Sequence, residues 1–317
     1  MNQIQIITDA GSDIIDCSRP DLTVLPMTIR FGEEEYLDGV NLTHIQFYEK
    51  MIGTQVLPTT SQPSPYAFET AIRKIHEQGD IALIITISSK LSGTWQSANI
   101  AAAETGGEVY IVDSLNVAVG EKAIVEYALR MKDAGTDIHT IVDTLNREKE
   151  NLRVIALLDT LEYLQKGGRI SKTVAIAGSL LSIKPVVSVV DGEVALLGKA
   201  RGSRQGNNLL VEKIHACGGI DFSLPILLGY TGLTDVFLKK YVEDSRALWE
   251  NGTDRLDSTL IGGVIGTHAG PGAFGMQLSK KNLTYHHYHS LILLYTSCYN
   301  HLYFLYMTYQ TSYISHH

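Results

Sequence analysis

A cluster of hydroxyl side chains follows an apolar run in the first third of the sequence. Residues 81–87 (IALIITI) are typical of a strand buried on both faces, and residues 95–103 are typical of a helix. The segment between them, residues 88–94 (SSKLSGT), contains Ser92 and Gly93. Free backbone N–H groups and the helix dipole favour an anion at such a helix N-terminus. The segment therefore predicts an anion site, with helix capping by its serines as the alternative.

A second hydroxyl-rich segment precedes this strand. Residues 58–65 (PTTSQPSP) contain three prolines, which exclude regular structure, and a helix is expected from Tyr66 to Glu77. The segment has two interpretations. It is a turn that leads into the helix, or its hydroxyls, Thr60 and Ser61, line the same crevice as Ser92. The second interpretation follows because ligands of open α/β sheets bind beyond the carboxyl ends of the strands.

His268 lies in the glycine-rich segment 266–275 (GTHAGPGAFG), which follows an expected last strand over residues 260–264. A buried, satisfied histidine is one interpretation. A functional histidine is the other, since glycines provide little side-chain packing to hold an imidazole. The glycines also match the spacing G-x-G-x-x-G, but no βαβ unit follows them, so a dinucleotide site is rejected.

Basic side chains form two clusters in an otherwise acidic chain. Lys166 and Arg169 flank a Gly-Gly pair, and Lys199, Arg201 and Arg204 form the second cluster. A solvated helix end explains such a cluster without any function. Alternatively, the arginines contact a phosphate or an acidic partner.

The bulk composition limits the classes of function. The chain has 317 residues, is 44% hydrophobic and carries a net charge of −8, which argues against nucleic-acid binding. Its three cysteines lack metal-ligand spacing and are odd in number, which favours a reducing compartment such as the cytoplasm. We expect no signal peptide and no metal site. We also expect no membrane span, because Asn300 and His301 interrupt the apolar stretch 291–307.

Strands and helices must position these segments. They alternate up to residue 149, which predicts a parallel sheet with helices on both faces. The pattern then becomes mixed, with a hairpin over residues 183–197. We therefore expect an α/β protein of two domains: an N-terminal parallel-sheet domain (1–150) and a C-terminal mixed-sheet α+β domain (151–277).

Several motifs occur together and in a fixed order along the chain. They are Thr8-Asp9 with Ser12-Asp13, Thr60-Ser61-Gln62-Pro63, Leu91-Ser92-Gly93-Thr94, Val112-Asp113-Ser114, Gly167-Gly168-Arg169-Ile170 and the segment from Gly266 to Gly272. In this combination the sequence resembles the DegV family, the fatty-acid-binding proteins of bacteria. The resemblance extends over roughly residues 3–276.

The resemblance implies a two-domain α/β fold with a long-chain fatty acid in a tunnel between the domains. Thr60, Ser92 and His268 match the residues that hold the carboxylate, with Ser61 and Gly93 beside them. The family acts as a carrier without catalytic residues or a cofactor. It presents the acid to the ATP-binding subunit of a fatty acid kinase, and the acyl phosphate feeds phospholipid synthesis. Arg169 and Arg201 become candidates for contact with phosphate or with that partner.

The last forty residues, 278–317, depart from this pattern. They contain eight of the chain's 16 tyrosines and six of its 11 histidines, and they lack Asp and Glu. We interpret this aberrant tail as a frameshifted or read-through C-terminus that replaces the family's last strand, in preference to a metal-binding tail. On this interpretation His268 loses support and ligand binding weakens.

A function of another class stays open on the sequence alone. Ser92 as nucleophile and His268 as base would make a serine-dependent acyl ester hydrolase. No orienting carboxylate is identifiable in the sequence, and Ser92 lacks the G-x-S-x-G motif. The carrier is therefore the preferred hypothesis.

Overall fold

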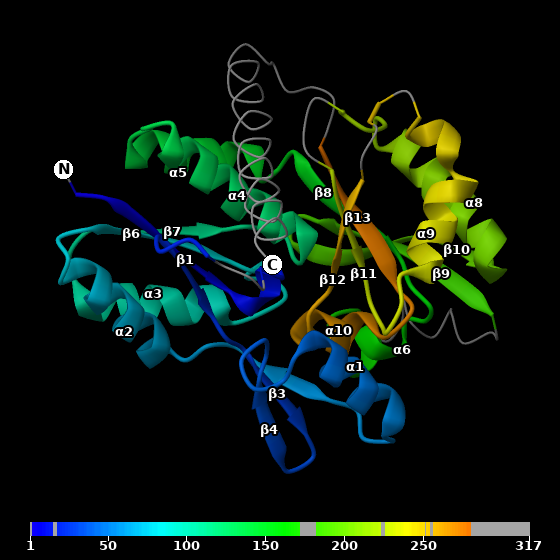
Figure 1. The fold of residues 1–317 in the computed structure, drawn as a ribbon, viewed down its shortest axis with the longest axis horizontal. Helices are drawn as coiled ribbons and strands as arrows, with labels where there is room; N and C mark the ends of the chain where they lie inside the picture. Colours follow the sequence, from blue (N-terminus) through cyan, green and yellow to red (C-terminus); the bar gives the residue numbers. More distant parts are fainter. Residues whose placement is uncertain are drawn as a thin grey trace, which may run out of the picture. The chain divides into compact units, whose positions relative to one another are not determined.

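A parallel four-stranded sheet forms the N-terminal part of the computed structural model (Figure 1). Its strands, in spatial order, are β2 (Leu22–Leu25), β1 (Ile4–Asp9), β6 (Ile81–Thr86) and β7 (Val109–Asp113). The structure describes residues 2–14, 18–171, 182–222, 226–250, 252–253 and 256–279. Within β6, Ala82 and Ile84 face one side of the sheet and Leu83 and Ile85 the other, because side chains alternate along a strand.

Helices cover both faces of this sheet (Figure 1). One face packs against α2 (Pro65–His76) and α3 (Thr94–Thr105), and the opposite face against α4 (Val119–Asp133) and α5 (Ile138–Glu148). The apolar runs of the strands are therefore buried on both sides, as the unbroken hydrophobic pattern predicted.

A mixed six-stranded sheet forms the C-terminal part. Its strands, in spatial order, are β10 (Glu193–Arg201), β9 (Ile183–Val190), β8 (Leu152–Leu157), β13 (Phe274–Ser279), β11 (Leu227–Tyr230) and β12 (Asp257–Leu260). The expected hairpin is present as the antiparallel pair β9 and β10. The α/β fold class, with a parallel sheet followed by a mixed sheet, is thus confirmed. The boundary between residues 150 and 151 stays a prediction, and Met1–Lys281 form one compact unit.

The two faces of the mixed sheet have different neighbours. Ile155 and Met276 face α8 (Gly202–Ala216) and α9 (Val236–Asp244), where they join a large apolar core. Val154, Ala156 and Val187, which alternate with core residues, line a cavity instead. One face of the sheet is therefore covered by helices, and the other borders a hollow space.

A small third sheet lies beside this hollow. It consists of β4 (Glu34–Leu37), β3 (Thr28–Phe31) and β5 (Thr59–Ser61), and it packs with α1 (His44–Gly53) against α10 (Gly263–Ala269). The short elements η1 (Ala10–Ser12) and η2 (Arg246–Leu248) follow β1 and α9, and α6 (Glu162–Lys166) contributes Leu164 to the cavity lining. In the part of the chain with described placement, no helix is long and apolar enough to cross a bilayer.

The segment around His268 differs from the expectation. The expected strand over residues 260–264 ends at Leu260, and His268 lies on a helix, α10, rather than in a loop. Glycine weakens isolated helices, so the sequence pattern indicated a loop. Here the glycines instead permit close packing: a Cβ on Gly263 or Gly266 would lie only 2.5 Å from Ile29 or from the Tyr48 hydroxyl, respectively.

The expectation that the tail replaces the family's last strand stays a prediction, although the described part of the chain ends in a strand. β13 follows α10 and pairs with both β8 and β11, and it includes Leu278 and Ser279 from the start of the predicted tail. Residues 280–317, with the rest of that tail, lie outside the described part of the chain.

Buried carboxyl groups gather where β1 ends. Asp9, Asp13 and Glu121 are almost fully buried, and Thr8 Oγ1 donates to Glu121 Oε1 at 3.1 Å. Burial raises the pKa of Asp9 to about 6 and the pKa of Glu121 well above its usual range. The charge of Asp9 is the second cause of the shift at Glu121. Glu121 therefore favours its protonated form in the folded chain.

Glu121→Gln should make stability less sensitive to rising pH. The unfolded chain releases the Glu121 proton near pH 4.5, whereas the folded chain retains it, so wild-type stability falls as pH rises above that value. The amide releases no proton. We expect the Tm of the variant minus that of the wild type to increase by a few degrees from pH 5 to pH 8. One kcal/mol of stability corresponds to roughly 2–4 °C in Tm.

Thermal unfolding followed by circular dichroism across this pH range checks the prediction. Glu104→Gln, at an exposed position of α3, is the control and should show no such gain. A Tm difference between Glu121→Gln and wild type that shrinks with rising pH would contradict the prediction.

Candidate ligand-binding site

A mostly apolar cavity lies against the open face of the mixed sheet. Its empty space amounts to about 1070 Å³, part of it open to solvent. The walls come from β8, β9, β10, β11, β13, α10 and the start of α4. Gly229 of β11 and Gly275 of β13 both line it and pair with each other, so this part of the wall carries no side chains.

Polar side chains are few in this lining. They are Thr60, Gln62, Ser92, Arg169, Ser188, Thr231 and His268. Ser188 and Thr231 already bond to backbone groups of the sheet and of the segment after α10. Thr60, Ser92 and His268, from three segments far apart in the sequence, thus line one cavity, and Arg169 lines it with them.

Thr60 and His268 are in direct contact. Thr60 Oγ1 lies 3.0 Å from His268 Nε2, which joins the third strand of the small sheet to α10. Thr60 pairs with Ile29 of β3, so its backbone position is fixed by the sheet. Its neighbour Ser61 is exposed and does not line the cavity, because adjacent residues of a strand point to opposite faces. A ligand role for Ser61 stays a prediction.

Ser92 lies directly before α3. Its Oγ is 2.9 Å from Thr94 Oγ1, and the helix begins with Gly93 as its N-cap residue. Glycine has no side chain to accept from the first N–H groups of the helix, which suits the expected anion. Gly93 also permits a close approach, since a Cβ there would lie 2.7 Å from Gln62 Nε2. Gln62 was named in the sequence only as part of a motif, and it also lines the cavity.

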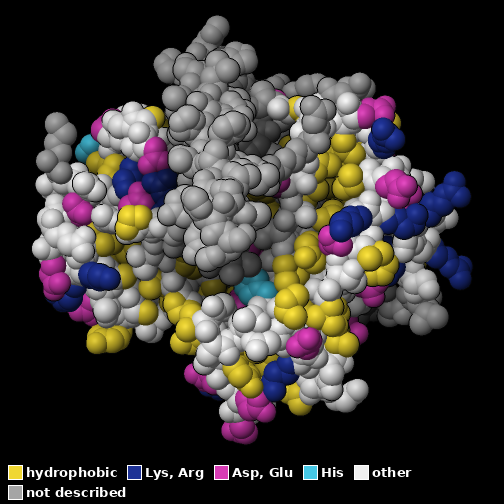
Figure 2. Space-filling model, in the orientation of Figure 1, with side chains coloured by type: hydrophobic (Ala, Val, Ile, Leu, Met, Phe, Trp, Pro, Cys, Tyr) yellow, Lys and Arg dark blue, Asp and Glu magenta, His cyan; other side chains and the backbone are white. Residues whose placement is uncertain are grey.

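The two predicted arginines have different environments. Arg169 lines the cavity, is half-buried, and donates from Nε to Leu91 O at 3.0 Å and from Nη1 to Gly167 O at 2.5 Å. Arg201 is exposed and immediately precedes α8. On the face seen in Figure 2, Lys and Arg side chains gather on the right, where Figure 1 places α8. A partner contact through Arg201 stays a prediction.

The imidazole of His268 is enclosed on its other side. A Cβ on Gly167 would lie 2.1 Å from His268 Nδ1, and no described residue bonds that nitrogen. Burial lowers the pKa of His268 from 6.5 to about 4, with a further contribution from the positive charge of Arg169. The ring is therefore neutral near pH 7 and offers one N–H donor and one acceptor.

This arrangement gives little support to nucleophilic catalysis. A serine–histidine site requires the base to contact the nucleophile and a third group to orient the base. Here the contact of His268 is with Thr60, and Ser92 Oγ contacts Thr94. Over the residues with described placement, no group of His, Cys, Asp and Glu side chains is arranged to hold a metal ion.

Gly167→Ala should displace His268. The added methyl group would overlap the imidazole, and the neighbouring Tyr163 carbonyl lies 3.1 Å from the Cβ position. We expect the free energy of unfolding to fall by about 1–3 kcal/mol, as for overpacked sites. Chemical denaturation measures this loss. Gly53→Ala is the control, since a Cβ at that helical position meets open space, and an equal loss in both variants would contradict the prediction.

Arg169→Gln should raise the pKa of His268. Removing the guanidinium charge eliminates one of the two causes that lower this pKa, while burial remains. An NMR titration of the imidazole C–H resonances measures the shift. Arg169→Lys keeps the positive charge, so its His268 pKa should stay below that of Arg169→Gln. Arg201→Gln should leave the pKa of His268 unchanged. An equal pKa in the wild type and in Arg169→Gln would exclude this electrostatic contribution.

The sequence matches a known family over most of the chain. The family model described as "Uncharacterised protein, DegV family" matches residues 3–281. A DegV domain-containing protein from Caldanaerobacter subterraneus subsp. tengcongensis is 32% identical over 286 residues, which cover 89% of this chain and 100% of that protein.

Solved structures share the fold. A fatty-acid-binding DegV family protein from Thermus thermophilus is 29% identical, with a TM-score of 0.78 over 88% of this chain and 99% of that one. The Streptococcus pneumoniae fatty acid kinase (Fak) B3 protein, loaded with linoleic acid, is 22% identical, with a TM-score of 0.76 over 87% and 99%. Because the family model matches residues 3–281, which are most of the chain, the chain belongs to the DegV family.

Proposed function

We propose that this protein binds a long-chain fatty acid, with the acyl chain in the apolar cavity and the carboxylate at Thr60, Ser92 and His268. The observation that carries the proposal is a largely apolar cavity with its hydroxyl and imidazole groups contributed by three distant segments. The fatty-acid-binding relative from Thermus thermophilus supports the choice of ligand.

The energetics assign different roles to the two parts of the site. Each buried CH₂ group contributes about 0.8 kcal/mol, before the cost of association is subtracted. A hydrogen bond to a charged group contributes about 1.5–3 kcal/mol, but burying the carboxylate costs several kcal/mol. The acyl chain therefore supplies most of the affinity. The hydroxyls and the imidazole compensate for the buried charge and select the headgroup.

Electrostatics near the headgroup favour an anion. Arg169 is the charged side chain among the cavity-lining residues. Burial of His268 and this positive charge keep the imidazole neutral near pH 7. A bound carboxylate stabilises the protonated imidazole, so the pKa of His268 rises on binding. Headgroup binding is then coupled to proton uptake in mildly acidic solution.

We further propose that the protein acts as a carrier in the cytoplasm and has no catalytic residue of its own. The ATP-binding subunit of a fatty acid kinase would phosphorylate the presented carboxylate, and the acyl phosphate would enter phospholipid synthesis. Arg169 at the cavity and Arg201 before α8 are the candidate contacts for phosphate or for the kinase. This part of the proposal rests on the family resemblance and on the exposed position of Arg201.

Ser92→Ala, Thr60→Val and His268→Ala should each weaken fatty acid binding. We expect Kd for oleic acid to rise about tenfold or more per variant, because each removes one bond to a buried charge. Isothermal titration calorimetry on delipidated protein measures Kd. Native mass spectrometry of the protein as purified shows whether a fatty acid accompanies it.

Two controls separate headgroup effects from loss of folding. Ser203→Ala removes an exposed hydroxyl from α8, outside the cavity lining, and should bind as wild type does. Oleyl alcohol, which has the same chain without the carboxylate, should lose much less affinity in the three variants. Wild-type protein that takes up no oleic acid would overturn the proposal. Turnover of a long-chain acyl ester that is lost in Ser92→Ala would instead establish the hydrolase.

A further inference from the structure

Helix α10 carries His268 but cannot stabilise its own N-terminus. The helix has seven residues, and isolated helices of that length are unstable in water. Its N-cap residue is Gly262, which has no side chain to accept from the free N–H groups of the first turn. These groups are buried, so they need acceptors from elsewhere in the chain.

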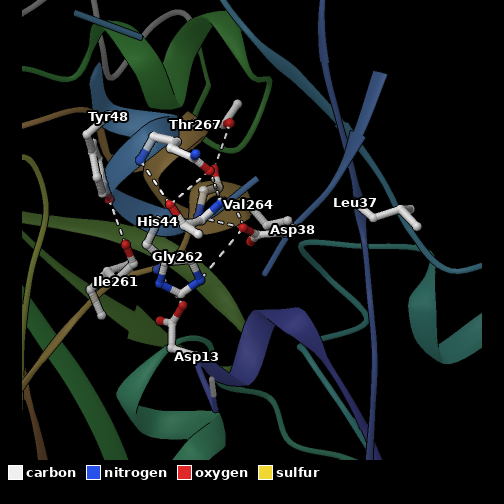
Figure 3. A network of polar contacts seen from close by, with 12 residues as sticks. Asp13, Leu37, Asp38, His44, Tyr48, Ile261, Gly262, Val264 and Thr267 are labelled. Carbon is white, nitrogen blue, oxygen red and sulfur yellow. Dashed lines mark hydrogen bonds and ion pairs between the residues drawn. The ribbon is translucent and has the colours of Figure 1, made fainter. Parts of the chain in front are cut away.

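Two buried aspartate side chains supply these acceptors from the N-terminal part (Figure 3). Gly262 N donates to Asp13 Oδ1 at 2.7 Å. Gly263 N and Val264 N donate to the two oxygens of Asp38, at 3.2 Å and 2.9 Å. Asp38 directly follows β4 and is 225 residues from Gly263 in the sequence. The side chain of one segment thus caps a helix in a distant one.

Further contacts fix the start of α10 relative to α1 (Figure 3). His44, the first residue of α1, places Nε2 3.7 Å from Asp38 Oδ1, and Tyr48 donates its hydroxyl to Ile261 O at 2.9 Å. A Cβ on Gly262 would lie 2.9 Å from His44 and from Asp13. The start of α10 therefore has little room to shift or rotate.

This anchoring determines the direction of the His268 side chain. Residues four apart lie on the same face of a helix, and Val264 and His268 both line the cavity. Val264 N is bonded to Asp38, whereas His268 meets Thr60 one turn later. A rotation or shift of α10 would carry the imidazole away from the Thr60 hydroxyl.

We propose that Asp38 and Asp13 are positioning residues, which cap α10 and thereby hold the His268 imidazole where it meets Thr60 and the carboxylate of the ligand. Neither aspartate lines the cavity, so each acts through His268. The inference rests on the proposed function and adds to it two residues that contribute to headgroup recognition without touching the ligand.

A double-mutant cycle tests this coupling. Asp38→Asn keeps the size of the side chain but replaces one of its two acceptor oxygens by an amide NH₂ group. This group is a donor, so it cannot accept from the backbone N–H of α10 that it faces. We expect Kd for oleic acid to rise about tenfold in Asp38→Asn. In the His268→Ala background the same substitution should change Kd less than about twofold, because the group it positions is absent. Oleyl alcohol binding should change little in all variants.

Asp137→Ala is the control for lost capping, since alanine has no side-chain acceptor for Thr140 N. Asp137 caps α5 through Oδ1, which accepts from Thr140 N at 3.1 Å, and α5 contributes no residue to the cavity lining. This variant should lose stability and keep its affinity for oleic acid. A general effect of stability on binding would weaken both aspartate variants alike.

The outcomes distinguish this inference from the proposed function. Wild-type affinity in Asp38→Asn, together with weak binding by His268→Ala, would overturn the positioning role and leave the fatty acid site intact. An equal, additive loss in the His268→Ala background would also overturn it. Absence of binding by the wild type would overturn the proposed function itself. If Asp38→Asn does not fold, Asp13→Ala takes the same test, because it removes the acceptor of Gly262 N and leaves both bonds of Asp38 in place.

Discussion

The structure depends on how the apolar inner face of the mixed sheet is buried. A sheet with hydrophobic residues on both faces needs a partner layer on each side. Helices α8 and α9 cover one face, but the other borders the cavity. Thr60 of the small sheet and several residues of α10 line this space without filling it. A bound acyl chain would supply the missing apolar contacts, so an apolar ligand completes the core rather than merely occupying its surface.

A fatty acid in this cavity would need polar partners only at its carboxylate end. The hydroxyls and the imidazole come from segments around residues 60, 92 and 268. The contact between Thr60 and His268 joins two of these segments, and the buried side chains of Asp13 and Asp38 connect α10 to the N-terminal segments as well. The proposed headgroup site and the association of the N-terminal and C-terminal parts therefore use the same short helix.

Sequence reasoning was most successful where hydrophobic periodicity is strong. The buried strand at residues 81–86 and the hairpin of β9 and β10 were predicted, and Thr60, Ser92 and His268 do line one cavity. The helix that carries His268 was predicted as a loop, since its glycines serve packing against Tyr48 and Phe47 that no local pattern shows.

Other site features depend on long-range geometry. The capping of α10 by Asp38 joins residues more than two hundred positions apart, so spacing in the sequence does not indicate it. Ser61 was grouped with Thr60 as a hydroxyl pair, but the strand geometry of β5 turns the two side chains in opposite directions. In the sequence, Gly167 was only part of a Gly-Gly pair between basic residues, whereas in the structure it leaves space for the imidazole.

The position of β13 has a consequence for folding during synthesis. All four strands of the parallel sheet are complete by Asp113, so that sheet has every strand it needs while the ribosome still makes the remaining chain. β13, the last described strand, instead lies between β8 and β11. Until residues 274–279 emerge, these two strands have unpaired edges of the kind that favours aggregation. The C-terminal sheet therefore closes late, and nascent chains that stop before β13 would be natural clients of chaperones.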